Sequence, residues 1–217
     1  MINTLIEAIN MAKNKSKKRN FIQAIELIVT LKGIDIKKPE NRIIAKVELP
    51  HEIIKRKTKI CVIADGDLAL KAKDAQADRI ISRQDLEKLK DDKKTAKKIA
   101  NEYDFFLAAA DLMPMIGKIL GPILGPRGKM PDPVAPSSDI NKLIKILRRS
   151  ILIKMRVSPQ VQCIVGSEDM NTRDIAENIM AVINFIDKRF PLAAHLSNIY
   201  IKTTMGPAVR VQTSIRR

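Results

Sequence analysis

The sequence predicts an α/β protein with two domains, one of them inserted into the other. The two ends of the chain carry the helix and strand patterns of a mixed α+β sandwich. Between them, short apolar strands alternate with helical segments, which is typical of a small parallel sheet with crossover helices. The first pattern returns after Ser150. We therefore expect a discontinuous domain of residues 1–55 and 151–217, interrupted by an α/β domain of residues 56–150.

The first part of the outer domain should form one helix and two strands. Apolar residues recur at helical spacing from Ile2 to Ala12, and Thr4 and Glu7 have the spacing of a capping box. A strand-like run, a turn and a second run follow. The expected elements are a helix over 2–12, strands over 21–31 and 42–49, and a turn over 33–40.

The inserted domain should begin with a buried strand over 60–64 that stops at Asp65-Gly66-Asp67. A helix to about Ala75 follows, with Asp67 as its expected cap, and Ser82 and Asp85 have capping spacing for the next helix. The remaining expected elements are a strand over 79–81, a solvated helix face over 88–98, a strand over 105–109, an apolar helix over 112–120, and a helix that starts at Ser137 or Ser138 and includes Leu147.

The last part of the outer domain should add strands over 151–155 and 161–165, with Pro159 in their turn. A helix opened by Thr172 and a closing strand from Asn198 complete it. The chain crosses between the domains near residues 51–58 and 149–151. Two crossings favour a hinge over a free tether.

Charge indicates the class of partner. The chain has 40 Lys and Arg against 24 Asp and Glu, a net charge of +16. A field of that sign attracts polyanions, and it exceeds what solubility requires. We therefore expect a nucleic acid partner.

Cysteine and histidine usage excludes several other classes. Cys61 and Cys163 stand in apolar runs far apart, which indicates buried thiols in a reducing compartment. His51 and His195 are isolated, so neither a structural zinc site nor a catalytic triad is expected. No apolar run approaches the length of a membrane span, and the basic run 13–19 follows the first helix, the reverse of a signal peptide. We expect a cytoplasmic protein without membrane, metal or cofactor.

The closing strand is the strongest candidate site. Successive strand residues face opposite sides, so Ile199 and Ile201 should face the core. The opposite face should carry Asn198, Tyr200, Lys202 and Thr204.

The turn after this strand has the chemistry of an RNA contact. Hydroxyls of Thr203 and Thr204 can bind phosphates or ribose 2′-OH groups, Met205 offers an apolar surface, and Gly206 permits close backbone approach. An ordinary turn at a strand end explains the same pattern equally well.

Two features of the inserted domain suggest an enzyme instead. Gly128-Lys129 resembles part of a phosphate loop, but Ile123 and Met130 stand where that motif needs Gly and Ser or Thr. The segment 121–131 is as well explained by a rigid loop as by RNA contacts through Arg127 and Lys129. A nucleotide- or metal-dependent enzyme using Asp65, Asp67 or Lys129 stays the rival hypothesis, and a general nucleic-acid condenser is a second one.

Three segments in the same order resemble the universal ribosomal protein L1 family, the large-subunit side-stalk protein, in its archaeal form. They are Tyr200–Pro207, Gly117–Pro131, and Phe21–Glu26 followed by Leu31–Asp35. The resemblance implies a split sandwich that grips RNA and an inserted Rossmann-like domain joined by a hinge.

The resemblance also implies the function. Members bind side-stalk rRNA of the large ribosomal subunit near the tRNA exit site and assist release of deacylated tRNA, and many repress their own mRNA. We therefore expect a non-catalytic RNA-binding protein without cofactor, a monomer when free, that resides in the ribosome.

The resemblance assigns RNA contacts to Phe21, Glu26, Thr204, Met205 and Gly206. Asn198 stands where the bacterial pattern often has Ser, and Lys154 replaces an Arg. Lys202 and Arg210 add charge, and Thr203 adds a hydroxyl. The expected RNA-binding set is Phe21, Glu26, Lys154, Asn198, Lys202, Thr203, Thr204, Met205, Gly206 and Arg210.

Overall fold

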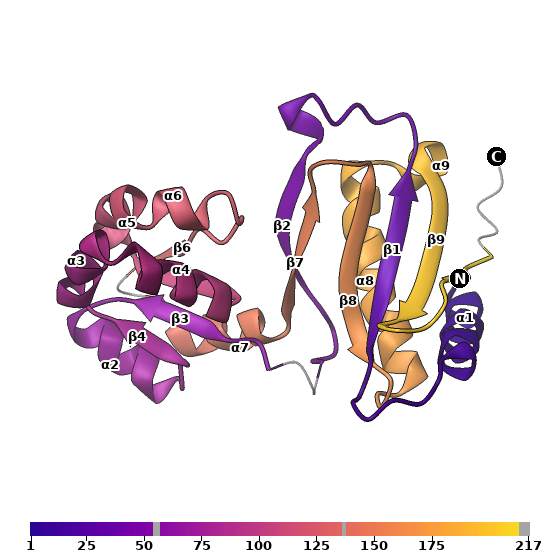
Figure 1. Ribbon diagram of the computed structural model, residues 1–217, viewed down its shortest axis with the longest axis horizontal. Helices are drawn as coiled ribbons and strands as arrows, with labels where there is room; N and C mark the ends of the chain where they lie inside the picture. The colour runs from indigo at the N-terminus through magenta and orange to yellow at the C-terminus, as the bar shows by residue number, and fades with distance from the viewer. Residues whose placement is uncertain (54–56, 136–137, 213–217) are drawn as a thin grey trace. The chain divides into compact units, whose positions relative to one another are not determined.

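The computed structural model describes residues 1–53, 57–135 and 138–212 (Figure 1). The chain divides into two compact units. The outer unit comprises Met1–Arg56 and Arg149–Arg217, and the inserted unit comprises Lys57–Arg148. These boundaries lie close to those expected from the sequence.

The outer unit is built on an antiparallel sheet with the strand order β10-β9-β1-β8. Helices α1 (Ile2–Lys15) and α8 (Thr172–Arg189) pack on its inner face, and α8 runs behind the strands in Figure 1. The strands are β1 (Ala24–Leu31), β8 (Gln160–Ser167), β9 (Leu196–Thr203) and β10 (Val209–Arg210).

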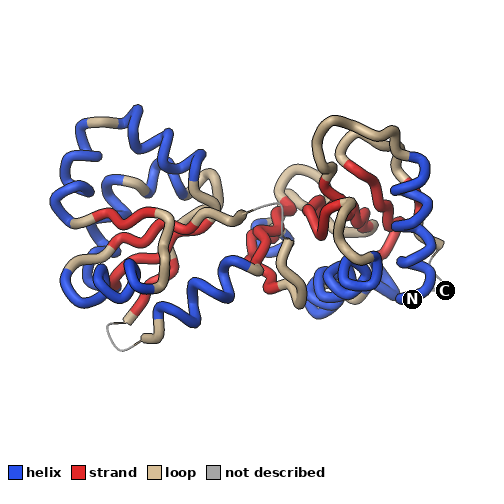
Figure 2. Tube along the Cα trace, turned by 90° about the horizontal axis from the view of Figure 1, so that it is seen from below, coloured by secondary structure: helices blue, strands red, loops and turns tan. Residues whose placement is uncertain are grey.

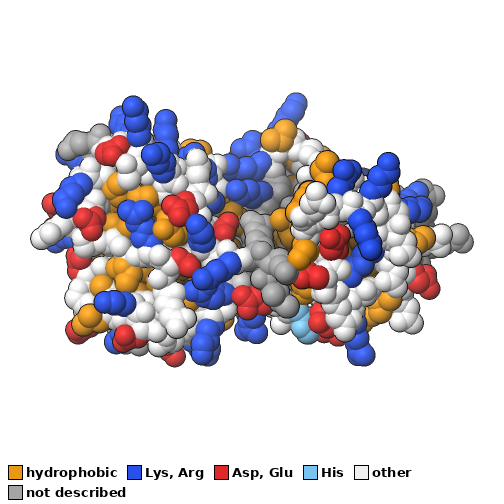
Figure 3. All heavy atoms as spheres, turned by 60° about the horizontal axis from the view of Figure 1, so that its bottom comes forward, with side chains coloured by type: hydrophobic (Ala, Val, Ile, Leu, Met, Phe, Trp, Pro, Cys, Tyr) orange, Lys and Arg blue, Asp and Glu red, His pale blue; other side chains and the backbone are white. Residues whose placement is uncertain are grey.

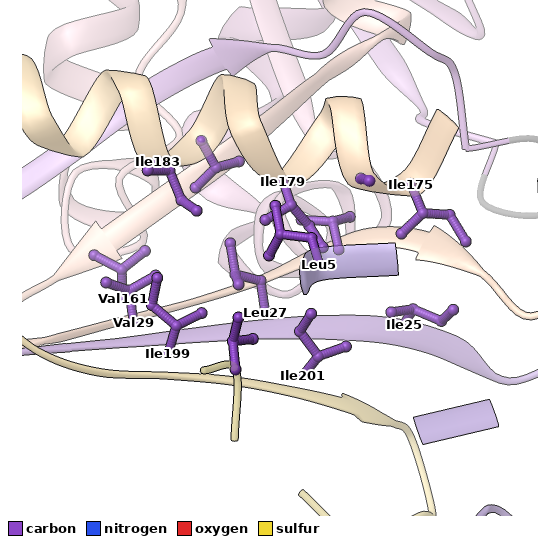
Figure 4. Close-up of a cluster of buried hydrophobic side chains, with 14 of the residues drawn as sticks. Leu5, Ile25, Leu27, Val29, Val161, Ile175, Ile179, Ile183, Ile199 and Ile201 are labelled. Carbon is purple, nitrogen blue, oxygen red and sulfur yellow. The ribbon is translucent and has the colours of Figure 1, made fainter. Parts of the chain in front are cut away.

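The core of this unit lies between the sheet and the two helices. Figure 4 shows Leu27 of β1 and Ile201 of β9 near Leu5 of α1 and Ile179 of α8. All four side chains are fully buried. Burial alternates strictly along β1, as period-2 strand geometry requires, so every second side chain points to the opposite, open side of the sheet.

A second, two-stranded antiparallel sheet joins β2 (Ile43–Glu48) and β7 (Ser150–Met155). The chain leaves the outer unit after β2 and returns into β7. Asn178 of α8 anchors the start of this crossing: its Nδ2 donates to the His51 carbonyl at 3.0 Å, and its Oδ1 accepts from the His51 amide at 2.9 Å. The middle of the crossing, residues 54–56, is outside the described residues.

The inserted unit contains a parallel sheet of order β4-β3-β5-β6, with helices on both sides (Figure 2). The prediction of a split sandwich with an inserted Rossmann-like domain is therefore confirmed. Its elements are β3 (Ile60–Ile63), α2 (Gly66–Asp74), β4 (Arg79–Ile81), α3 (Arg83–Asp91), α4 (Lys93–Glu102), β5 (Phe105–Ala109), α5 (Met113–Ile119), α6 (Gly121–Leu124), β6 (Asp132–Val134) and α7 (Ile140–Arg148). Three short elements complete the described chain: η1 (Pro39–Asn41), η2 (Ala110–Leu112) and α9 (Leu192–His195).

Two of the three predicted caps were wrong. Helix α1 begins at Ile2, so Thr4 lies inside it and donates to the Met1 carbonyl at 2.6 Å instead of capping. Asp67 lies in the first turn of α2, where Asp65 holds the cap position without a side-chain cap bond. The third cap is confirmed, because Ser82 Oγ accepts from the amide of Asp85 at 3.2 Å.

Several predicted boundaries also differ, and two of them bear on the candidate sites. Strand β1 begins at Ala24, so Phe21 precedes it. Segment 121–131 is not all loop, because α6 occupies its first four residues, Gly121–Leu124. Helix α7 begins at Ile140, later than expected; the candidate start at Ser137 is outside the described residues.

The thiols and His51 have defined environments. Burial raises the pKa of Cys61 to about 12 and that of the half-buried Cys163 to about 12. His51 is not isolated: its Nε2 lies 2.7 Å from Glu177 Oε2, and this hydrogen bond holds the pKa of Glu177 below its ordinary value. Within the described ranges, no helix combines the length and hydropathy that a membrane span needs.

Candidate nucleic-acid interface

The open face of the four-stranded sheet and the turn that follows β9 bring most of the predicted site residues together. We define the open face as the outward side chains of three strands: Glu26, Ile28 and Thr30 of β1, Asn198, Tyr200 and Lys202 of β9, and Arg210 of β10. Cross-strand register places Lys202 opposite Glu26 and Arg210 opposite Tyr200. Polar groups that can donate and accept therefore lie side by side on one surface.

Lys202 links this face to the following turn. Its Nζ lies 3.8 Å from Glu26 Oε2 and donates to the Thr204 carbonyl at 3.0 Å. An ion pair this close to solvent contributes little stability. Its consequence is orientation: the ammonium group is held at the junction of strand and turn.

The turn of Thr204, Met205 and Gly206 is fixed to the start of β1. The Thr204 amide donates to the Ala24 carbonyl at 3.0 Å, and the Ala24 amide donates to Thr204 Oγ1 at 3.1 Å. The Met205 amide donates to Gln23 Oε1 at 3.1 Å, while the Met205 side chain is 60% exposed. The turn thus presents a large apolar side chain to solvent from a fixed backbone.

The structure corrects the prediction that the Thr203 hydroxyl faces a ligand. Its side chain is fully buried, on the same side of β9 as Ile199 and Ile201, and its hydroxyl donates to Ser16 Oγ at 2.8 Å. The hydroxyl is therefore used inside the protein and does not face a ligand.

Gly206 has a structural role beyond close approach to a ligand. Its amide donates to the Thr203 carbonyl at 3.1 Å. A Cβ at this position would overlap Thr203 Oγ1 and would lie 3.3 Å from Ser16 Oγ. The turn closes onto the Thr203–Ser16 pair only because Gly206 lacks a side chain.

Phe21 and Asn198 are both available to a ligand in part. The Phe21 side chain is 52% exposed, two residues before the buried Gln23. Asn198 is half-buried on the open face; its Nδ2 donates to Ser197 Oγ at 3.2 Å, and its buried Oδ1 accepts no bond within the described part of the chain. A buried acceptor without a donor is unfavourable, so Asn198 would gain by turning toward a donor on a ligand.

Lys154 lies on a different sheet from the other candidates. It is exposed on β7, opposite Ile44 of β2. The pKa of Lys154 is lowered, mainly because the side chain is partly buried. The positive charge of the nearby Arg156 lowers it further. The structure does not bring Lys154 into the cross-strand array of the open face.

Two residues of the enzyme hypothesis, Lys129 and Asp65, already have hydrogen-bond partners within the inserted unit. Lys129 Nζ donates to the carbonyls of Ala100 at 3.0 Å and Tyr103 at 2.6 Å, so it satisfies the C-terminal end of α4. Arg127 Nη1 donates to the Ile123 carbonyl at 3.1 Å within its own turn. Asp65 accepts from the Arg83 amide at 3.1 Å, and the described residues contain no group of three side chains suited to hold a metal.

Two residues of this interface, Gln23 and Ser16, are not among the predicted site residues. Gln23 is only 1% exposed. One signal was available: Gln23, Ile25 and Leu27 follow the inward period of β1, so a polar residue at position 23 has to find buried partners. Two of those partners, Glu168 and Met205, are 145 and 182 positions away in the sequence, and no local pattern indicates them.

Basic side chains are spread widely over the surface of the molecule. Figure 3 shows Lys and Arg side chains across the visible surface of both units, with fewer Asp and Glu among them. The open face and this charge define the class: a two-domain α/β protein with the surface of a nucleic-acid-binding protein.

Comparison with known proteins identifies the family. Residues 12–207 match the family described as the ribosomal protein L1p/L10e family. The chain is 48% identical over 215 residues to large ribosomal subunit protein uL1 of Thermofilum pendens, covering 99% of this chain and 95% of that protein. It is 46% identical to the protein of the same name from Methanobrevibacter smithii (97% and 100% covered) and 45% identical to that from Archaeoglobus fulgidus (95% and 96% covered).

The chain therefore belongs to the ribosomal protein L1 family, and it is of the archaeal type. Proteins of this family are structural components of ribosomes and not enzymes, which confirms the prediction of a non-catalytic, cytoplasmic ribosomal protein. The rival hypothesis of a nucleotide- or metal-dependent enzyme is not supported.

Proposed function

We propose that this protein is a component of the large ribosomal subunit that binds the rRNA of the side stalk through the open face and the turn of Thr204 to Gly206. The names of the relatives support membership of the large ribosomal subunit. One observation supports this assignment of the binding site. Met205 presents an exposed side chain at the end of a polar open face, and its backbone is fixed by a hydrogen bond to the buried Gln23.

The contacts follow from the chemistry of the groups. RNA is recognised by shape, by its 2′-OH groups and by unstacked bases. Glu26 accepts hydrogen bonds from 2′-OH or base amino groups, Met205 packs on a base or sugar, and Phe21 offers a ring for stacking. Lys202 and Arg210 attract phosphates without reading sequence.

The remaining parts of the proposed function concern tRNA and mRNA. In this proposal the side stalk assists release of deacylated tRNA near the exit site, with weaker contacts from the inserted unit. The protein also represses translation by binding a similar structure in its own mRNA. Crosslinking in cells followed by sequencing of bound RNAs tests both: side-stalk rRNA, tRNA and the protein's own message should be enriched over other transcripts.

Removing one basic residue of the open face should reduce the salt dependence of binding. Arg210 is exposed beside Tyr200. If it contacts one phosphate, Arg210→Gln should lower the slope of log K against log salt by about 1 in magnitude and weaken all RNAs alike. Filter binding at four salt concentrations measures this. An unchanged slope removes Arg210 from the interface.

The outer unit alone should keep most of the specific affinity. Thr58 Oγ1 donates to the Arg148 carbonyl at 3.2 Å, so the two ends of the inserted segment are adjacent and a short Gly-Ser linker can replace it. A variant that lacks residues 57–148 should bind side-stalk rRNA within about fivefold of the full chain, since the proposed contacts with side-stalk rRNA all lie outside the deletion. If the variant is folded by circular dichroism but does not bind, the site lies in the inserted unit.

A further inference from the structure

We propose that Gln23 is a positioning residue for RNA recognition: its buried side-chain amide fixes the Met205 turn to the basic segment 17–19, so that the two bind RNA as one rigid surface. This inference rests on the proposed function and concerns a residue that does not itself touch RNA.

Gln23 holds the turn through its side-chain oxygen. Gln23 Oε1 accepts the Met205 amide at 3.1 Å across 182 positions of sequence. This bond determines the path of the backbone from which the Met205 side chain reaches solvent. A carboxamide oxygen or a carboxylate at position 23 can make the bond; an apolar side chain of the same size cannot.

Gln23 holds the basic segment through its side-chain nitrogen. Gln23 Nε2 donates to Ser16 Oγ at 2.9 Å and lies 3.2 Å from the Lys17 carbonyl, which places it at the start of the basic segment. It also lies 3.3 Å from Glu168 Oε2, in the loop after β8. One side chain thus ties together three chain segments and leaves the side chains of Lys17, Lys18 and Arg19 exposed.

Ser16 closes the arrangement. It accepts from Thr203 Oγ1 as well as from Gln23, and it lies under Gly206. The basic segment, the turn and the end of β9 therefore share one partly buried set of hydrogen bonds. A buried network whose members are all paired holds a single geometry, and losing one member leaves the others without partners.

Gln23 can affect RNA binding only indirectly, because its side chain is buried. Its side chain is 1% exposed, so an RNA molecule bound to the surface meets Met205 and the lysines but not Gln23. Pre-organised contacts slow dissociation because less ordering has to occur on binding. Charge steers association, and charge is unaltered when Gln23 is replaced by a neutral residue.

The test uses the full chain and a transcribed archaeal side-stalk rRNA fragment. Gln23→Met keeps the size and removes the hydrogen bonds; we expect affinity to fall about tenfold through faster dissociation, with an unchanged salt slope and faster hydrogen exchange at the Met205 amide. The matched control, Gln84→Met on the exposed face of α3, should bind like the wild type.

A second pair of variants protects the test against simple unfolding. Gln23→Glu keeps the acceptor for Met205 but sets a carboxylate against Glu168, and it should bind weakly. The double variant Gln23→Glu with Glu168→Gln restores a donor–acceptor pair between the two positions and should recover most of the affinity.

The outcomes separate this inference from the proposed function. If the wild type binds the side-stalk fragment no better than random RNA, the proposed function fails. If the wild type is specific and Met205→Asp abolishes specificity, but folded Gln23→Met keeps the wild-type dissociation rate, the positioning role of Gln23 is overturned. Failure of the double variant to recover, with a wild-type melting temperature, overturns it as well.

Discussion

Met205→Asp should reduce the affinity for side-stalk rRNA by about 100-fold at physiological salt. The side chain is 60% exposed at the tip of the turn, so the substitution leaves the core unchanged. It removes an apolar contact of the size that stacking residues make, about 1–3 kcal/mol, and sets a negative charge against phosphates. Because every 1.4 kcal/mol is about tenfold in affinity, the two effects together give the expected loss.

The control for this variant has the same charge change elsewhere. Leu70 is 63% exposed on α2 of the inserted unit, so Leu70→Asp alters net charge equally without touching the turn. It should cost less than about threefold in affinity. RNA titration of both variants at one salt concentration, with melting curves, separates loss of the Met205 contact from the general effect of the protein's net charge. Equal losses in the two variants would contradict the assignment of Met205.

Gly206→Ala should have the second largest effect. The added Cβ would overlap Thr203 Oγ1, which is fully buried and bonded to Ser16, so the turn has to move away from the sheet. Overpacking of this kind costs about 1–3 kcal/mol in stability. Displacement of the Met205 backbone should lower RNA affinity by about tenfold or more. Chemical denaturation and RNA titration of the same sample measure both.

A double-mutant cycle identifies the cause of the Gly206 effect. Thr203→Ala removes the oxygen that the new methyl group would meet. In that background Gly206→Ala should cost much less, with a coupling of about 1 kcal/mol or more between the two positions. If the two substitutions are additive, the contact with Thr203 is not the reason for glycine, and its role is close approach to the ligand.

Much of the fold was predictable because it depends on local patterns. The apolar alternation of β9 placed Ile199 and Ile201 inward and Lys202 outward, as observed. The same alternation puts Thr203 inward, but the chemistry of its hydroxyl was given more weight than its position in the strand. The burial of Gln23 follows the period of β1 in the same way.

The remaining errors concern partners that are far apart in the sequence. The glycine-rich loop around Lys129 suggests phosphate binding, but the partners of Lys129 are the carbonyls of Ala100 and Tyr103, which only the packing of α4 brings near. The partners of Gln23 at Glu168 and Met205 likewise depend on the sheet order. No local pattern of the sequence contains this information.

Competition binding tests the central claim most directly. Labelled side-stalk rRNA bound to the full chain at physiological salt is challenged with unlabelled side-stalk rRNA, random-sequence RNA and double-stranded DNA. The unlabelled folded RNA should compete at least about a thousandfold better than the others, a typical ratio of specific to non-specific binding. Equal displacement by all three would contradict it and would mark the protein as a general nucleic-acid condenser.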